Sequence, residues 1–374
     1  MRVVLTGGGT GGHIYPALAI ARQVTDAEPG SELLYIGSNR GLERELAAKE
    51  QIPFEAIEIS GFRRSLSWEN VRTILRFVRG VRRSKQLLRR FQPDIVVGTG
   101  GYVCGPVVYA AVKLGIPTVL HEQNVIPGLT NAFLSRYADL VAVSFPESSN
   151  NFPRAKRVLY TGNPRASQVV HADGARGLES LGMRLAADEK LVIVMGGSRG
   201  AKAINDSMIE MAPLIAAQPS GLKFVFITGQ PYFESTMSKI REQLDAWPEA
   251  LKVVPYVHNM PEVLAAASLI VSRSGASSLA EITALGLPSI LIPSPNVTNN
   301  HQEANARWLE REGAAKVILE RDLDGRTLYD AVCRIADDAI RFEHMSRMSK
   351  KLGKPDAAEA IYEAMCGLIR GQNF

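Results

Sequence analysis

The sequence predicts an α/β fold in which two domains each contain a doubly wound parallel sheet. Strand-like apolar runs alternate with helical patterns, glycine-rich turns follow four of the runs, and the second half of the chain repeats the organisation of the first. This alternation is typical of parallel strands joined by right-handed crossovers. A length of 374 residues suits two domains of ordinary size.

The strand-like runs form two series. They comprise residues 2–6, 32–36, 94–98, 117–121 and 139–144, and then residues 190–195, 223–228, 252–257, 268–272 and 288–293. A turn at 160–164 ends the first series, and a polar helical stretch at 172–189 precedes the second. We therefore expect domains at residues 1–163 and 164–344.

The first run leads into the turn that dominates the sequence. Residues 7–12 contain five glycines, His13 follows, and a helical apolar pattern begins at Ile14. Backbone N–H groups of such a turn, with the dipole of the helix that follows, form an anion site. The pattern predicts a phosphate site, and a tight turn without a ligand is the alternative.

Two common phosphate motifs do not match this turn. Gly7, Gly9 and Gly12 have the dinucleotide spacing, but the next strand, 32–37, ends without the carboxylate that would bind a ribose. A P-loop requires a lysine where this chain has His13. The sequence therefore disfavours an NAD enzyme and a Walker-type ATPase.

Three further turns of the same kind follow later strands. They are Gly98–Pro106, Met195–Ala201 and Ser272–Glu281. Ligands of open α/β sheets bind at the carboxyl ends of the strands. Two domains facing each other would therefore gather all four turns around one central cleft.

Composition restricts the class of protein. A hydrophobic content of 46% and a charged content of 22% describe an ordinary soluble globular chain. Three widely spaced cysteines indicate neither a disulfide framework nor a CxxC metal site, so a reducing cytoplasm is expected. Neither a signal peptide nor an apolar run long enough to span a membrane is recognisable.

Positive charge is concentrated in residues 62–90, which contain ten basic side chains and one acid in a chain of net charge +5. On a helix, this segment gives an apolar stripe flanked by arginines, which favours contact with an anionic membrane surface. The residues expected there are Trp68, Arg72, Ile74, Leu75, Arg76, Phe77, Val78, Arg79 and Val81. An ordinary docked helix is the alternative. Nucleic-acid binding is disfavoured, because no recognised motif or aromatic platform accompanies the charge.

Seven motifs occur in a fixed order: Gly7–His13, Gly98–Tyr102, His121–Asn124, Gly162–Arg165, Gly196–Ala201, Arg273–Ala276 with Glu281, and His301–Gln302. Through them the chain resembles, nearly end to end, the MurG-type peptidoglycan N-acetylglucosaminyltransferases of GT-B architecture. The resemblance implies two Rossmann-like domains facing a central cleft, with a C-terminal helix, within about 345–374, that packs back on the first domain.

The activity that the resemblance implies is inverting transfer of GlcNAc from UDP-GlcNAc to the 4-hydroxyl of undecaprenyl-diphospho-MurNAc-pentapeptide, which converts lipid I to lipid II. It places the enzyme peripherally at the cytoplasmic face of the bacterial membrane and allows other cell-wall synthesis proteins as partners. Another GT-B enzyme, such as a glycolipid synthase or a UDP-GlcNAc epimerase, remains an alternative. A non-enzymatic anion-binding membrane module and an oxidoreductase explain fewer of the features.

A departing diphosphate can be stabilised by a metal ion or by helix N-termini and backbone donors. The Asp-x-Asp sequence at Asp322–Asp324 is interpreted as a turn and helix start. We therefore expect metal-independent catalysis without a cofactor.

The resemblance, read onto the glycine turns, implies a set of site residues. Those expected to bind the donor are Thr10, Gly11, Gly12, Asn124, Arg165, Ser198, Arg199, Val257, Gly275, Ala276, Ser277, Ser278, Glu281, Asn300 and Gln302. Within this set, Glu281 would accept the ribose hydroxyls and Val257 would contact the uracil through its backbone. The acceptor diphosphate is assigned to Gly9, Gly100, Gly101 and Tyr102.

Inverting transfer also needs a base for the attacking hydroxyl. His13 is the first candidate, because it projects from the phosphate turn and titrates in a useful range. A nearby diphosphate would favour the protonated ring, so an electrostatic or positioning role is the main alternative, and helix packing is a further one. Glu122 is the second candidate for the base.

Overall fold

The computed structural model describes residues 1–39, 41–60, 68–217 and 221–372, and for residues 68–72 it describes the backbone alone. The chain divides into two compact units. Unit 1 comprises Met1–Ser167 and Lys354–Phe374, and unit 2 comprises Gln168–Gly353.

Unit 1 is built on a seven-stranded sheet in the order β3-β2-β1-β4-β5-β6-β7, in which all neighbouring strands are parallel. Its strands are β1 Arg2–Thr6, β2 Glu32–Ser38, β3 Phe54–Ile57, β4 Ile95–Gly98, β5 Thr118–Glu122, β6 Leu140–Val143 and β7 Val158–Tyr160. Its α-helices are α1 Gly11–Ala27, α2 Glu43–Lys49, α3 Trp68–Phe91, α4 Cys104–Val112, α5 Leu129–Leu134 and α14 Ala357–Ile369. Two 3-10 turns, Pro146–Asn151 and Pro164–Gln168, follow β6 and β7.

Unit 2 is built on a six-stranded parallel sheet in the order β10-β9-β8-β11-β12-β13. Its strands are β8 Lys190–Met195, β9 Leu222–Ile227, β10 Leu251–Val254, β11 Leu269–Ser272, β12 Ser289–Leu291 and β13 Ala315–Val317. Its α-helices are α6 Gly174–Ser180, α7 Lys202–Ala217, α8 Phe233–Gln243, α9 Met260–Ala265, α10 Ala276–Leu285, α11 His301–Arg311, α12 Gly325–Ala336 and α13 Ala339–Leu352. Short 3-10 turns occupy Gln230–Tyr232, Thr298–Asn300 and Glu320–Asp322.

Both sheets reverse their strand order at one point. In unit 1 the order runs outward in both directions from the adjacent strands β1 and β4, and in unit 2 from β8 and β11. Ligands of doubly wound sheets bind at this switch point, beyond the carboxyl ends of the strands. The predicted α/β fold with two doubly wound parallel sheets is confirmed, and all four glycine turns follow switch-point strands.

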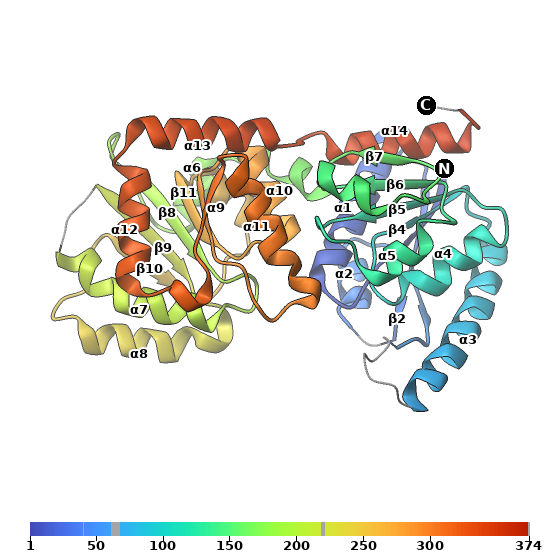
Figure 1. Cartoon of the computed structure of the whole chain (residues 1–374), viewed down its shortest axis with the longest axis horizontal. Coiled ribbons are helices and arrows are strands. Elements are labelled where there is room, and N and C mark those ends of the chain that lie inside the picture. Colours follow the sequence, from blue (N-terminus) through green and yellow to red (C-terminus); the bar gives the residue numbers. More distant parts are fainter. Residues whose placement is uncertain (40, 61–67, 218–220, 373–374) are drawn as a thin grey trace. The chain divides into compact units, whose positions relative to one another are not determined.

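The sheet of unit 1 is covered on both faces because its central strands are apolar on both sides. Val3 and Leu5 of β1 pack toward α1 and α14, whereas Val4 packs toward α3 and α4. The C-terminal helix α14, red in Figure 1, contributes Ile361 and Met365 to the first of these clusters. Buried central strands of parallel sheets read as continuous apolar runs, as these do.

Three strands were missed by the sequence analysis: β3, β7 and β13. Each is three or four residues long and lies at an edge of its sheet. An edge strand is covered less fully, so its sequence lacks the continuous apolar run of a central strand. The predicted helical stretch at 172–189 also contracts to the single short helix α6.

Helix α3 confirms the predicted amphipathic helix but divides its apolar residues between two faces. Phe77 lies 6.2 Å, ring centroid to ring centroid, from Tyr109 of α4, and Val81 packs against the core. Ile74, Leu75 and Val78 are exposed by 53%, 54% and 43%. Phe77 and Val81 are half-buried, so the fully exposed apolar residues of the predicted membrane set are Ile74, Leu75 and Val78, and membrane contact of the set stays a prediction. Across the described residues, no helix has the length and apolarity needed to cross a membrane.

Candidate active site

In unit 1, the turns that follow β1 and β4 are in direct contact. The Gly8 N–H donates to the Gly100 carbonyl at 3.2 Å. Gly101 has φ +81°, and a Cβ there would lie 2.1 Å from the Gly8 oxygen. Glycine is required at this position both by the backbone conformation and by the close approach. The two predicted cradles therefore form one continuous surface of main chain.

The amides of this surface do not all face a ligand. Besides the Gly8 N–H, the Gly9 N–H is occupied, because it donates to Oε1 of Glu43 at 3.0 Å. Gly9 therefore has its N–H directed at Glu43, and its predicted place beside the acceptor diphosphate stays a prediction. Tyr102 lies beside Gly9, within 3.3 Å of where a Gly9 Cβ would be.

The amides that remain lie at the start of helices. Helices α1 and α4 begin immediately after the two turns, neither has a side-chain cap, and neither has an acidic residue in its first turn. Thr10 and Gly12 are exposed at the start of α1. In α1, the first-turn N–H groups of Gly11 and Gly12 have no partner within the helix, so they can bind an anion. In α4, the Cys104 N–H donates to the Gly101 carbonyl at 3.3 Å and Pro106 has no N–H, so its first turn is not a comparable donor site.

His13 lies in the first turn of α1 with its ring held by the main chain. Its Nδ1 is 3.0 Å from the Gly8 carbonyl oxygen and 3.3 Å from Oγ1 of Thr10. The Thr99 hydroxyl donates to the His13 carbonyl at 2.7 Å and fixes the backbone. A carbonyl only accepts, so Nδ1 carries the hydrogen and the neutral ring has its lone pair on Nε2. That tautomer suits a proton acceptor.

Glu122, the second candidate base, has a different environment. It is buried, and both oxygens are occupied. Oε1 accepts from the N–H and side-chain amide of Asn124 at 3.0 and 3.3 Å, and Oε2 accepts from Gly128 N at 3.1 Å and Asn131 Nδ2 at 2.9 Å. These donors make Glu122 an anchor for the loop after β5. The contacts to Glu122 also hold Asn124 at the end of that strand.

His121 precedes Glu122 on β5 and is fully buried. Its Nε2 lies 3.1 Å from the Gly162 carbonyl, and its Nδ1 lies 3.0 Å from Nε2 of Gln123. Burial lowers the pKa of His121 from 6.5 to about 4. The ring is therefore neutral at physiological pH, and its two contacts connect the end of β5 to Gln123 and to the Gly162 carbonyl.

In unit 2, the turn after β8 contains Ser198 and Arg199, which are both exposed. Gly200 has φ +75°, and a Cβ at Gly200 would lie 2.0 Å from the Thr228 oxygen. The turn therefore packs closely against the end of β9, and its two polar residues are exposed.

The second turn of unit 2 leads from β11 into α10. Gly275 is the N-cap without a side-chain hydrogen bond, and the first turn, Ala276–Ser278, contains no acid. The Ser277 hydroxyl is buried and makes no hydrogen bond to any of the described residues. Glu281 is buried in the second turn of α10. An uncapped helix N-terminus beside an unsatisfied hydroxyl is a site prepared for an anionic ligand.

Gln302 is bound to the same turn. The Ser274 hydroxyl donates to the Gln302 carbonyl at 2.7 Å, and the Ser294 N–H donates to Gln302 Oε1 at 2.9 Å. The oriented side chain has its NH₂ group, a double donor, directed away from Ser294. The structure thus brings the predicted residues Gly275–Ser278 and Gln302 together.

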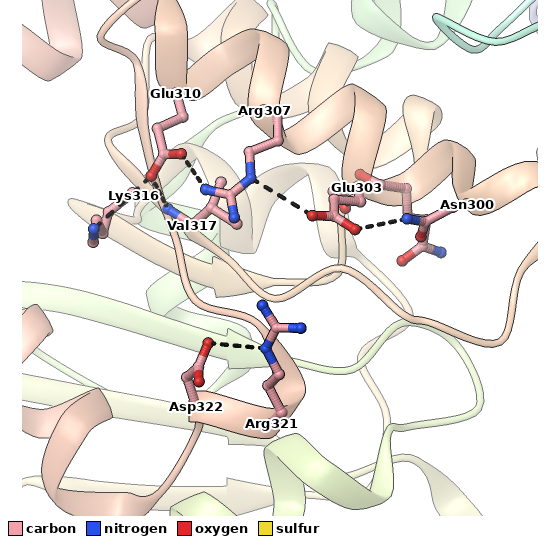
Figure 2. Close-up of polar contacts among 10 residues, drawn as sticks. Asn300, Glu303, Arg307, Glu310, Lys316, Val317, Arg321 and Asp322 are labelled. Carbon is pink, nitrogen blue, oxygen red and sulfur yellow. Dashed lines mark hydrogen bonds and ion pairs between the residues drawn. The ribbon is translucent and has the colours of Figure 1, made fainter.

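Asn300 precedes α11 and is exposed. Its side-chain amide donates to Glu303 at 2.6 Å, and Glu303 begins a line of polar contacts through Arg307 and Glu310 to the N–H of Val317 (Figure 2). The contact with Glu303 leaves the Asn300 amide oxygen as the group that could meet a sugar hydroxyl.

Two predicted donor contacts lie outside these clusters. Val257 follows β10 at the carboxyl edge of the unit 2 sheet and is half-buried. Arg165 belongs to unit 1, where its guanidinium carbon lies 5.2 Å from the centre of the Tyr15 ring. Asp324 caps α12 by accepting from the Thr327 N–H at 2.6 Å, which confirms the predicted helix start.

The predicted membrane residues lie on α3 where they are described. Arg76 donates to the Ser60 hydroxyl at 3.0 Å, whereas Arg79 is exposed beside Val78. The side chains of Trp68 and Arg72 lie outside the described residues, as do residues 61–67.

Sequence reasoning missed Glu43 and Thr99, which support the first glycine turn. Glu43 is fully buried, although it follows a segment without any recognisable motif. Thr99 lies inside the Gly98–Tyr102 motif, in which the glycines carry the recognisable pattern. The signal in the sequence for Glu43 was the pair of nearby glycines, Gly37 and Gly41. Pairs of glycines are too common in loops to identify one carboxylate as buried.

Comparison with protein families matches both halves of the chain. The glycosyltransferase family 28 N-terminal domain matches residues 3–143, and the glycosyltransferase family 28 C-terminal domain matches residues 191–361. A Bacillus cytotoxicus protein is 50% identical over 370 residues, which cover 99% of this chain and 100% of that protein. Its name is UDP-N-acetylglucosamine--N-acetylmuramyl-(pentapeptide) pyrophosphoryl-undecaprenol N-acetylglucosamine transferase. A Halalkalibacterium halodurans protein of the same name is 51% identical over 364 residues, covering 97% and 98%.

Among solved structures, the crystal structure of Acinetobacter baumannii MurG matches with a TM-score of 0.77 and 28% identity, covering 98% of this chain and 99% of that one. A UDP-GlcNAc 2-epimerase from Neisseria meningitidis, bound to UDP-GlcNAc, matches with a TM-score of 0.66, covering 98% and 100%. Its identity of 15% shows a shared fold and no more.

Proposed function

Because the chain belongs to glycosyltransferase family 28, we propose that it transfers N-acetylglucosamine from UDP-N-acetylglucosamine to N-acetylmuramyl-(pentapeptide) pyrophosphoryl-undecaprenol. The observation that carries the proposal is 50% identity over nearly the whole chain to a transferase of that name. Epimerases are similar at 15% identity, in fold alone, so the transferase prediction is favoured over the epimerase alternative.

Unit 2 binds the donor in this proposal. The N-terminus of α10 presents uncapped N–H groups and the buried Ser277 hydroxyl to the diphosphate. Ser198 and Arg199 approach from the turn after β8, Glu281 accepts ribose hydroxyls, and Gln302 donates to the sugar. A helix N-terminus stabilises the negative charge that develops on departing UDP, which is the charge a metal ion would otherwise offset. Full activity in excess EDTA is therefore expected.

Unit 1 binds the acceptor and supplies the base. The amides at the start of α1 bind the acceptor diphosphate, beside Gly100, Gly101 and Tyr102. The acceptor hydroxyl oxygen forms a bond to the anomeric carbon as the bond from that carbon to UDP breaks. Nε2 of His13 takes the hydroxyl proton, in the tautomer that the Gly8 carbonyl selects. Attack opposite the leaving group inverts the anomeric centre.

Helix α3 attaches the enzyme to a membrane from its cytoplasmic face. Ile74, Leu75 and Val78 form an exposed apolar strip, and Arg79 and Arg82 are exposed next to it. Apolar side chains enter the interfacial region of a bilayer, while neighbouring arginines pair with anionic headgroups. A peripheral position brings unit 1 to an acceptor whose polyprenyl chain remains in the bilayer.

The test is UDP release from UDP-GlcNAc with and without a polyprenyl-diphospho-MurNAc-pentapeptide acceptor. The proposal expects release only with the acceptor, together with a disaccharide product. Acceptor-independent conversion of the sugar to its 2-epimer would instead identify an epimerase. His13→Ala is expected to lower kcat by about 10²–10⁴, and the exposed His171→Ala serves as the matched control.

A further inference from the structure

Glu43 is a buried carboxylate at the start of α2 that the proposed reaction does not use. It is 0% exposed. A Cβ on either Gly8 or Gly41 would lie 2.0 Å from one of its oxygens, and one on Gly37 would lie 3.1 Å from its Cβ. Three glycines thus leave room for this one side chain. Burying a carboxylate is costly, so its presence requires an explanation.

The contacts of Glu43 lead to the glycine turn. Oε1 accepts from the Gly9 N–H at 3.0 Å and from the Ser38 hydroxyl at 3.1 Å. Oε2 is buried and has no hydrogen-bond partner in the described part of the chain. The oxygen of Glu43 that is hydrogen-bonded is therefore the one that contacts the glycine turn. This bond is strong, because a buried hydrogen bond to a charged group is stronger than one between neutral groups.

The Gly9 N–H and the Gly8 carbonyl belong to the same peptide group. Its N–H donates to Glu43, and its carbonyl accepts from Nδ1 of His13 at 3.0 Å. A single planar unit thus connects the buried carboxylate to the ring of the proposed base. Hydrogen bonds in such a chain polarise one another.

We infer that Glu43 is a positioning residue, which fixes the tautomer and orientation of the His13 ring through the Gly8–Gly9 peptide. The inference deepens the proposed function, since it rests on His13 as the base. Gly9 has φ +85°, and glycine tolerates the backbone conformations on either side of a rotation of this peptide. If this peptide turned over, Nδ1 of His13 would face an N–H donor, and the ring would change to the Nε2–H tautomer, which cannot accept the proton.

The neighbouring peptide shows why Glu43 is needed. The Gly7–Gly8 peptide is held at both ends, because the Tyr35 hydroxyl donates to the Gly7 carbonyl at 2.7 Å and the Gly8 N–H donates to Gly100. On the Gly8–Gly9 peptide, the contact opposite His13 is supplied by Glu43. Among the described residues, removing Glu43 leaves that peptide with its contact to the His13 side chain.

The experiment replaces Glu43 in the full-length enzyme and reads the ring of His13 directly. Nitrogen-15 spectra of the six histidines, with His13 assigned from a His13→Gln variant, report which ring nitrogen carries the hydrogen. In wild type, the Nδ1–H tautomer is expected. In Glu43→Leu, the Nε2–H form should appear, with kcat reduced about 10- to 100-fold and KM for UDP-GlcNAc unchanged.

Two variants separate positioning from folding. Glu43→Gln keeps an oxygen that can accept the Gly9 N–H, so it should restore most of the tautomer and of kcat. Glu45→Gln is the matched control on the same helix, where the glutamate is exposed and pairs with Lys49 at 2.9 Å. If Glu43→Leu does not fold, Glu43→Asp, which retracts the carboxylate by one methylene, gives the same measurement.

The outcomes distinguish the inference from the proposed function. An unchanged His13 tautomer in folded Glu43→Leu or Glu43→Asp overturns the inference, whatever the activity. A changed tautomer with unchanged kcat supports the positioning of His13 by Glu43 and overturns the role of His13 as the base.

Discussion

The buried His121 should make the stability of the enzyme depend on pH. Its ring nitrogens meet partners that suit the neutral form, because Nδ1 faces the Gln123 side-chain amide at 3.0 Å and Nε2 faces the Gly162 carbonyl at 3.1 Å. Burial lowers the pKa of His121 from 6.5 to about 4. As pH falls below 6.5, the His121 ring is therefore protonated in the unfolded chain while it remains neutral in the folded chain.

The size of the effect follows from the two pKa values. Each unit of pKa difference corresponds to about 1.4 kcal/mol, so the full loss, reached below the folded pKa of about 4, is about 3 kcal/mol. At about pH 5 the unfolded ring is almost fully protonated and the folded ring is almost neutral, and about 2 kcal/mol is lost. Above pH 6.5, the pKa of His121 in the unfolded chain, none of this stability is lost.

Urea denaturation at about pH 7.5 and about pH 5 measures this loss. The change in the free energy of unfolding between the two pH values is measured for wild type and for His121→Gln. Subtracting one change from the other cancels the contributions of the other titrating groups. The variant should be less stable at neutral pH but should lose about 2 kcal/mol less on acidification. A double difference below about 0.5 kcal/mol would refute the reasoning.

Three further changes test the site and the membrane surface. Gly101→Ala should lower the free energy of unfolding by about 1–3 kcal/mol and greatly reduce activity, because φ is +81° and the added Cβ meets the neighbouring turn. Gln302→Ala should raise KM for UDP-GlcNAc about tenfold with little change in kcat, since it removes oriented donors worth about 1.4 kcal/mol. Leu75→Gln should weaken binding to phosphatidylglycerol vesicles about fivefold in a sedimentation assay, because about 1 kcal/mol of apolar burial is lost.

Each change has a control in this chain. Gly115 also has positive φ, +71°, but no atom lies near its Cβ position, so Gly115→Ala isolates backbone strain from the clash. Gln243 is exposed at the end of α8, and Gln243→Ala should leave KM unchanged. Ile340 is 84% exposed on α13, and equal loss of vesicle binding in Ile340→Gln would contradict a specific role for α3.

The central strands and their turns were predictable from local sequence because both signals are local. A buried parallel strand is an apolar run, and a turn with positive φ is rich in glycine. Gly100 and Gly101 illustrate this, with φ of +102° and +81°. The three missed edge strands lack the first signal, because one side of each has no neighbouring strand.

The roles of individual side chains depended on contacts that sequence does not contain. Apolar residues on α3 occupy positions around much of the helix, and only the position of α4 decides that Phe77 faces inward and Leu75 outward. Glu122 stays a candidate base, but the sequence did not show that its two oxygens accept from four donor groups. The role of Glu43 could not be predicted, because its partner Gly9 lies 34 residues away in the sequence.

Helix α14 completes unit 1 with a segment that is synthesised after the whole of unit 2. Ile361 and Met365 complete the cluster beneath α1, and the Tyr362 hydroxyl donates at 2.9 Å to Glu28, which also accepts from the amino group of Met1 at 2.8 Å. A nascent chain emerging from the ribosome therefore finishes unit 2 before the sheet it made first receives its last covering helix. Ribosomal stalling before residue 357 would leave α1 with an uncovered apolar face, open to aggregation or to a chaperone.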